Sequence, residues 1–130
     1  MSNYKPEGYN SVSPYLIVSG AEKMIDFLIE VFDGTPTRRF NTPDGSIMHA
    51  EVKLDDSIIM ISEATEQFPP NNSLLHVYVQ NSDEVYQRAL AYGCEDQGAP
   101  KKAGGDSDKR GMFKDFAGNL WAVSTQSFGH

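Results

Sequence analysis

The sequence has one cysteine, few basic residues and no long hydrophobic run, and each shortage excludes a class of protein. Cys94 has no partner for a disulfide or a zinc knuckle, so we interpret it as a passive thiol. The net charge of -7 argues against nucleic acid as a partner. No run is long enough to span a bilayer and the polar N-terminus shows no signal peptide, so we expect no membrane partner and a cytoplasmic location.

The composition indicates one soluble globular domain over residues 1–130. Apolar residues (39%) and charged residues (22%) are interleaved along the whole length, and a chain of this size can bury an ordinary core. No Gly-rich phosphate loop, nucleophile elbow or HExxH motif is present, so no common catalytic motif indicates the chemistry.

The first half of the chain predicts a strand, a helix and three further strands. Residues 12–18 (VSPYLIV) are rich in β-branched and aromatic side chains, which is typical of a strand. The spacing in 19–32 is helical and places three apolar residues on one face: Met24, Leu28 and Val31. The turn formers TPDG and DD then separate three predicted strands: 35–41, 46–54 and 57–63.

The same order of elements starts again after a linker. The stretch ATEQFPPNN (64–72) contains two prolines and two asparagines, which mark the linker. Residues 74–80 predict a strand and SDEVYQRALAYG (82–93) a helix, with Ser82 placed to cap its start and Gly93 just past its end. GMFKDFAGNLWAVST then predicts a hairpin that turns at AGN.

Core positions repeat between the halves together with the elements. A shift of about 61 positions superimposes four pairs of core residues: Val79 on Val18, Val85 on Met24, Ala89 on Leu28 and Tyr92 on Val31. We therefore predict an internal duplication, with one module over about 10–64 and the other over about 73–126.

A tandem β-α-β-β-β chain resembles the vicinal oxygen chelate superfamily, which includes glyoxalase I, bleomycin resistance proteins and extradiol dioxygenases. Three stretches carry the resemblance: SPYLIVSGAEKMIDFLIEVFDG, IMHAEVKLDDSIIMIS and KDFAGNLWAVST. The last is similar to the family's Asp-Pro-x-Gly-Asn hairpin, with Phe116 in place of proline, and together they are most similar to the PhnB-like branch. The resemblance implies an α+β fold in which the two modules curl a mixed sheet around a cleft, commonly shared across a homodimer.

The resemblance also implies four metal-ligand positions in the cleft, two from each module. On the matching motifs they fall on Ser13, Glu51, Leu74 and Ala122. Only Glu51 can ligate well, because a serine hydroxyl is a weak ligand and Leu and Ala offer no lone pair. We therefore expect no cofactor. A displaced divalent-metal site formed by His49, Glu51 and His76 is the alternative.

His49 and Glu51 are the candidates for catalysis. Alternation along the strand 46–54 places them on one face with Ile47 and Lys53, and places Met48 with Ala50, Val52 and Leu54 on the other. A neutral histidine can both donate and accept a hydrogen bond, which suits the orientation of a ligand as well as catalysis.

The remaining predicted cleft residues mix aromatic and apolar groups with a few polar ones. Tyr15 and Ile17 share the face of Ser13, and Tyr78 shares that of His76. The full set predicted to line the cleft is Ser13, Tyr15, His49, Glu51, Leu74, His76, Tyr78, Arg110 and Ala122.

Two neighbouring stretches have structural interpretations. Trp121 precedes Ala122 and should face the core under a helix. The glycine-containing stretch 101–113 is expected to be a loop, either solvated or at the mouth of the cleft, where Arg110 can meet an anionic ligand.

Two functions from different classes follow. The leading one is a metal-free protein that binds or sequesters a small, partly apolar molecule, as bleomycin resistance proteins do. The alternative is a metal-dependent enzyme of the glyoxalase or dioxygenase type, an isomerase, lyase or oxygenase, in which a carboxylate such as Glu51 shuttles a proton. The count of metal ligands favours binding, and the sequence does not decide whether the protein is an enzyme.

Overall fold

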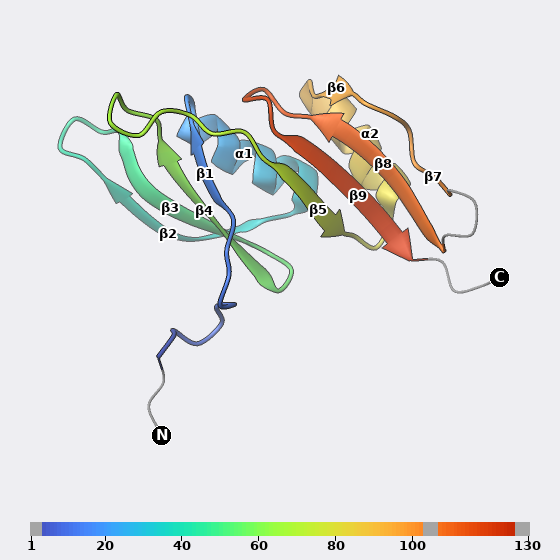
Figure 1. The fold of residues 1–130 in the computed structure, drawn as a ribbon, viewed down its shortest axis with the longest axis horizontal. Helices are drawn as coiled ribbons and strands as arrows, with labels where there is room; N and C mark the ends of the chain where they lie inside the picture. The colour runs from blue at the N-terminus through green and yellow to red at the C-terminus, as the bar shows by residue number, and fades with distance from the viewer. Residues whose placement is uncertain (1–3, 103–106, 127–130) are drawn as a thin grey trace. The chain divides into compact units, whose positions relative to one another are not determined.

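The computed structural model describes residues 4–102 and 107–126, which fall into two compact units, Met1–Asn71 and Asn72–His130. Each unit contains a mixed β-sheet and one helix, so the α+β prediction is confirmed (Figure 1). The first unit consists of β1 (Tyr15–Val18), α1 (Ala21–Phe32), β2 (Thr35–Asn41), β3 (Ile47–Leu54) and β4 (Ser57–Glu63). The second consists of β5 (Leu74–Tyr78), α2 (Ser82–Tyr92), β6 (Glu95–Asp96), β7 (Lys101–Lys102), β8 (Asp108–Lys114) and β9 (Leu120–Gln126).

The sheet of the first unit has the strand order β1-β4-β3-β2, with β1 parallel to β4 and the other pairs antiparallel. Leu16, Ile61 and Ala50 are paired across it, and all three are almost completely buried. Helix α1 contributes its own buried side to the core of this unit: Ala21, Met24, Ile25, Phe27, Leu28 and Val31. The predicted helical face is therefore confirmed.

The opposite side of this sheet carries the functional residues. The neighbouring row of paired residues consists of Tyr15, Met60 and Glu51, and it faces away from the row that packs under the helix. We call this side of the sheet the open face. Alternation along β1 and β3 therefore separates the core from the candidate site by one residue.

The alternation predicted for residues 46–54 is wrong at Met48, because β3 contains a bulge there. The register between β2 and β3 shifts so that Phe40 pairs with His49 and Asn41 with Ile47, which leaves Met48 without an opposite residue. As a result Ile47 is buried and Met48 is 57% exposed, whereas the sequence predicted Met48 on the core side. Beyond the bulge the predicted alternation holds, because Ala50 and Val52 are in the core.

A carboxylate from another strand caps the start of α1. The residue at the N-cap is Gly20, which has no side chain, and Glu63 at the end of β4 accepts hydrogen bonds from the backbone N–H groups of Gly20 (3.0 Å) and Ala21 (2.9 Å). Both oxygens of Glu63 are therefore used at the positive end of the helix dipole.

The second unit repeats the central pairing of the first. Strand β5 lies parallel to β9, and β8 and β9 form the predicted antiparallel hairpin. The first of the three expected strands is reduced to the short β6 and β7, both paired with β8. Helix α2 begins after Asn81, whose side chain accepts from the N–H of Glu84, so the prediction that Ser82 caps the helix is wrong by one residue. Gly93 follows the helix with a positive φ, as predicted.

The turn of the β8–β9 hairpin is organised by a buried aspartate. One oxygen of Asp115 accepts from the backbone N–H groups of Ala117 and Asn119, and the other accepts from the Asn119 amide and from the indole N–H of Trp121 at 2.8 Å. Trp121 is completely buried, which confirms its predicted place in the core.

The prediction of a loop over residues 101–113 is wrong for most of this stretch. Of the predicted loop 101–113, residues 101–102 and 108–113 belong to strands β7 and β8, and 103–106 lie outside the described residues.

None of the helices in the described part of the chain has the length and apolar character needed to cross a membrane.

Candidate ligand pocket and buried carboxylate

The first unit contains a pocket of about 450 Å³ on the open face. Its size lies within the range of small-molecule sites. Eleven residues from β1, the β2–β3 turn, the start of β3, β4 and the segment after β4 line it: Tyr15, Ile17, Thr42, Ser46, Ile47, Met48, Ser62, Glu63, Ala64, Thr65 and Phe68.

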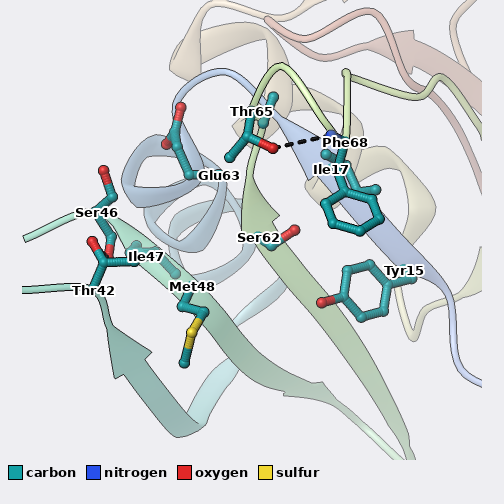
Figure 2. A pocket seen from close by; sticks show the side chains of 11 residues that line it. Tyr15, Ile17, Thr42, Ser46, Ile47, Met48, Ser62, Glu63, Thr65 and Phe68 are labelled. Carbon is teal, nitrogen blue, oxygen red and sulfur yellow. Dashed lines mark hydrogen bonds between the residues drawn. The ribbon is translucent and has the colours of Figure 1, made fainter.

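The pocket lies between two walls (Figure 2). Tyr15 and Phe68 form one wall, and Met48 with the β2–β3 turn forms the other. Phe68 is 58% exposed, and its position is fixed by a hydrogen bond from its N–H to the Thr65 hydroxyl at 3.0 Å. Two rings and a thioether therefore present apolar surface toward the space between the walls.

Polar groups in the pocket are few, and its one carboxylate is already used. Glu63 binds the start of α1 through both oxygens, as described above. Ser62 lies in β4 between the two walls (Figure 2). The Tyr15 hydroxyl points toward the opposite wall and is the polar end of an otherwise aromatic surface (Figure 2).

Glu51 lies in the same row of paired residues as Tyr15 and is buried, with 3% of its surface exposed. One carboxylate oxygen accepts a hydrogen bond from the Tyr9 hydroxyl, and the other is 2.7 Å from His49 Nε2. Tyr9 comes from the N-terminal segment, 42 residues away in the sequence. A buried carboxylate is tolerated only with such partners.

The pKa of Glu51 is held below its ordinary value. Burial alone would raise it, but the hydrogen bonds from Tyr9 and His49, with the electrostatic attraction of His49 and Arg38, outweigh the desolvation. The same contact raises the pKa of the Tyr9 hydroxyl, because its proton is held by the carboxylate. Glu51 is therefore an ionised acceptor at neutral pH.

His49 connects this carboxylate to the pocket. Its Nδ1 is 3.2 Å from the Tyr15 hydroxyl, and the two rings are 5.7 Å apart between centroids. The result is a continuous hydrogen-bonded chain, which we call the relay: Tyr9, Glu51, His49 and Tyr15. Of its four members, Tyr15 lines the pocket.

The second unit has a separate polar cluster on the face of β5, β9 and β8. His76 Nε2 is 2.9 Å from the buried Ser124 hydroxyl, and Arg110 Nε donates to the same hydroxyl at 3.0 Å. Tyr78 donates to Asp108 at 2.8 Å. Arg110 is therefore part of a strand and its hydrogen-bond network, and not of a loop as the sequence predicted.

The structure brings the predicted site residues together within each unit. Glu51, His49 and Tyr15 meet in the first, and Ser13 precedes the same strand as Tyr15. In the second unit these predicted residues share one side of the sheet, because Leu74 pairs with Leu120, His76 with Ala122, and Tyr78 with Ser124, which in turn pairs with Arg110. That the two sets line one cleft stays a prediction.

Sequence reasoning missed Tyr9, Phe68 and Ser124. Ser124 was within reach, because it lies two residues after Ala122 on the same strand and so shares its face. Tyr9 and Phe68 lie outside the strands, in segments whose course no periodicity reveals.

Comparison with known proteins decides the family. The sequence profile of the family described as Glyoxalase/Bleomycin resistance protein/Dioxygenase superfamily matches residues 9–123. The chain belongs to this superfamily. An uncharacterised protein of Mycobacterium bovis, Mb0911c, is 27% identical, over 87% of this chain and 81% of its own length.

Solved structures of other proteins share the fold. TioX from Micromonospora sp. ML1 superimposes with a TM-score of 0.76 at 20% identity, covering 90% of this chain and 98% of its own. TnmS3, an antibiotic binding protein from Streptomyces sp. CB03234, gives a TM-score of 0.70 at 20% identity, covering 88% and 93%. A PhnB protein from Bacillus cereus gives 0.68 at 18% identity, covering 89% and 99%.

The divalent metal that many superfamily members hold does not fit the residues present. Leu74 and Ala122 carry no donor atom at the ligand positions that the resemblance implies, and both oxygens of Glu51 are engaged by Tyr9 and His49. Within residues 4–102 and 107–126, no group of three or more His, Cys, Asp or Glu side chains could hold a metal ion.

The free energy of unfolding tests whether Tyr9 holds the buried carboxylate of Glu51. We expect Tyr9→Phe to lower the free energy of unfolding at about pH 7 by clearly more than the control variant below, because it removes a donor from a buried carboxylate. A carboxyl group with a lowered pKa stabilises the fold fully above the ordinary glutamate pKa, and the contribution disappears as pH falls through the lower pKa of the folded state. The loss caused by Tyr9→Phe should therefore shrink toward about pH 3.

Tyr4→Phe is the matched control, because Tyr4 lies in the same segment and is 84% exposed. It should change the free energy of unfolding by less than about 0.5 kcal/mol at either pH. Denaturant titrations of both variants measure the difference. An equal, pH-independent effect in the two variants would show that Tyr9 does not hold the carboxylate.

Proposed function

We propose that the protein binds a small, largely apolar molecule that contains a ring, in the pocket of the first unit and without a metal. The observation that carries this proposal is the pocket itself, whose volume of about 450 Å³ is walled by Tyr15, Phe68 and Met48. Aromatic rings and a methionine give extended, adaptable apolar contact to a ligand of this kind.

The comparisons support binding of this class without identifying the molecule. One protein with the same fold, TnmS3, is described as an antibiotic binding protein. In this chain, two of the four implied metal positions, Leu74 and Ala122, lack a donor atom, and the carboxylate of Glu51 at a third is committed to a hydrogen-bonded chain. We therefore favour binding or sequestration over the metal-dependent enzyme that the sequence left as the alternative.

A neutral fluorescent probe tests the pocket. N-phenyl-1-naphthylamine should bind at one site per chain with a dissociation constant on the order of micromolar. Ser62→Phe places a ring between the two walls and should weaken binding at least about tenfold. Fluorescence titration measures both. Ser107→Phe, at an exposed position of the second unit, is the control and should bind as the unchanged protein does.

The outcome that would contradict the proposal is equal binding of the probe by the protein and by Ser62→Phe, provided that both unfold at the same temperature. Absence of any saturable binding would contradict it as well. Either result would show that the space between the two walls is not a ligand site.

Metal content separates the proposal from the enzyme alternative. We expect the purified protein to carry well below one equivalent of transition metal per chain, and Glu51→Ala to leave that content unchanged. Elemental analysis of the protein purified without chelators makes the measurement. One equivalent of zinc, nickel, manganese or iron that is lost in Glu51→Ala or His49→Ala would bring the enzyme alternative to first place.

The proposal includes a cytoplasmic homodimer. Strand β2 is the last in its sheet, and all seven of its residues are exposed, so its outer edge needs protection from uncontrolled pairing. The other edge strand, β1, is already covered, because Asn71 exchanges hydrogen bonds with Tyr15 and Ile17. Light scattering should give twice the mass of one chain, and a monomer mass at micromolar concentration would remove the dimer.

A further inference from the structure

We propose that the ligand carries an O–H or N–H donor, most simply a phenol, and that it donates this hydrogen to the Tyr15 oxygen. The inference rests on the proposed function, because it names the chemical class of the molecule in the same pocket. It also assigns a role to His49 and Glu51, which act through Tyr15 and do not touch the ligand. They are positioning residues.

Glu51 can only accept hydrogen bonds. An ionised carboxylate has no hydrogen to donate, and Glu51 is buried with a donor on each oxygen. His49 Nε2, at 2.7 Å from one of these oxygens, must therefore be the nitrogen that carries the hydrogen. Glu51 thus selects one of the two tautomers of the neutral imidazole.

The tautomer of His49 fixes the direction of its hydrogen bond with Tyr15. In a neutral imidazole with Nε2 protonated, Nδ1 has a lone pair and no hydrogen. At 3.2 Å from the Tyr15 oxygen, Nδ1 can only accept, so the Tyr15 hydroxyl donates to it. The single hydrogen of the Tyr15 hydroxyl is then directed away from the pocket and toward His49.

The lone pairs of the Tyr15 oxygen remain available to a ligand. With its hydrogen used, the Tyr15 oxygen offers lone pairs to the pocket, and it can only accept from a bound molecule. Tyr15 is 42% exposed and its hydroxyl points between the two walls (Figure 2). A ring that packs beside Phe68 and carries a hydroxyl at its edge can satisfy this oxygen, and a ring with only an acceptor there cannot.

Two other polar groups of the pocket, Glu63 and Thr42, can also only accept from a ligand, whereas the remaining hydroxyls have no fixed preference. Both oxygens of Glu63 are bound to the start of α1, and the Thr42 hydroxyl donates to Asp44. A serine hydroxyl such as that of Ser62 can rotate to donate or to accept. Every group of fixed polarity in the pocket therefore favours a donor, and Tyr15 is the one among them that belongs to the relay.

A matched pair of probes isolates the donor. 2-Naphthol and 2-methoxynaphthalene have the same ring, but only the first can donate a hydrogen bond. Measured at about pH 8, where imidazole side chains are mostly neutral, the protein should bind 2-naphthol about tenfold more tightly. The ratio of the two dissociation constants is the readout, because a general loss of packing changes both.

Three variants test whether the ratio of the two dissociation constants depends on the relay. Tyr15→Phe should reduce the ratio to about one while 2-methoxynaphthalene still binds, because the acceptor is gone and the ring remains. His49→Leu should also reduce it, since the Tyr15 hydroxyl is then free to donate. Glu51→Gln should retain most of it, because the amide oxygen can still accept from Nε2. Ser62→Ala is the control and should keep the ratio.

The possible failures are distinguishable. If neither probe binds, the proposed function fails, and this inference with it. If both bind to the unchanged protein with equal affinity, the pocket stands and the donor preference is wrong. A tenfold ratio that survives in Tyr15→Phe would also overturn the inference, because another group would then be reading the hydroxyl.

Discussion

A carboxylate that is removed from water between two strands needs hydrogen-bond donors, and this requirement organises the open face of the first unit. Glu51 obtains one donor from Tyr9 and one from His49. The first contact ties the N-terminal segment to the sheet, and the second fixes the orientation of the imidazole whose other nitrogen reaches Tyr15. Removing the whole carboxylate side chain would leave three side chains without the interaction that orients them.

The same carboxylate explains how a superfamily position is put to another use. The resemblance implies that Glu51, Leu74 and Ala122 stand where metal-dependent members carry ligands, but the partners of Glu51 on this chain are hydrogen-bond donors. The backbone of the fold is kept while the chemistry on it changes. We interpret the site as one that orients a ligand through Tyr15, with Glu51 and His49 as its support.

The sequence predicted the elements well, because the signals for them are local. Alternation in 46–54 placed Glu51 and His49 together, and the helical spacing in 19–32 placed Met24 and Leu28 in the core. The exposure of Met48 could not be predicted, since a bulge depends on the register with β2.

The supporting contacts of the site were hidden for a related reason. Tyr9 reaches Glu51 across 42 residues, and a segment without periodicity gives no sign of its course. The helix cap was missed by one residue because Asn81 and Ser82 are both good capping residues, and the structure decides between neighbours. Local pattern therefore yielded the strands and the paired residues on them, and tertiary contacts completed the site.

The protonation of the His49 ring tests the central claim most directly, because the whole relay depends on it. A long-range proton–nitrogen correlation NMR spectrum of the ¹⁵N-labelled protein at about pH 8 distinguishes the two ring nitrogens of each histidine, with His49→Gln providing the assignment. The account predicts a hydrogen on Nε2 and none on Nδ1. A hydrogen on Nδ1, or rapid exchange between the two tautomers, would contradict it.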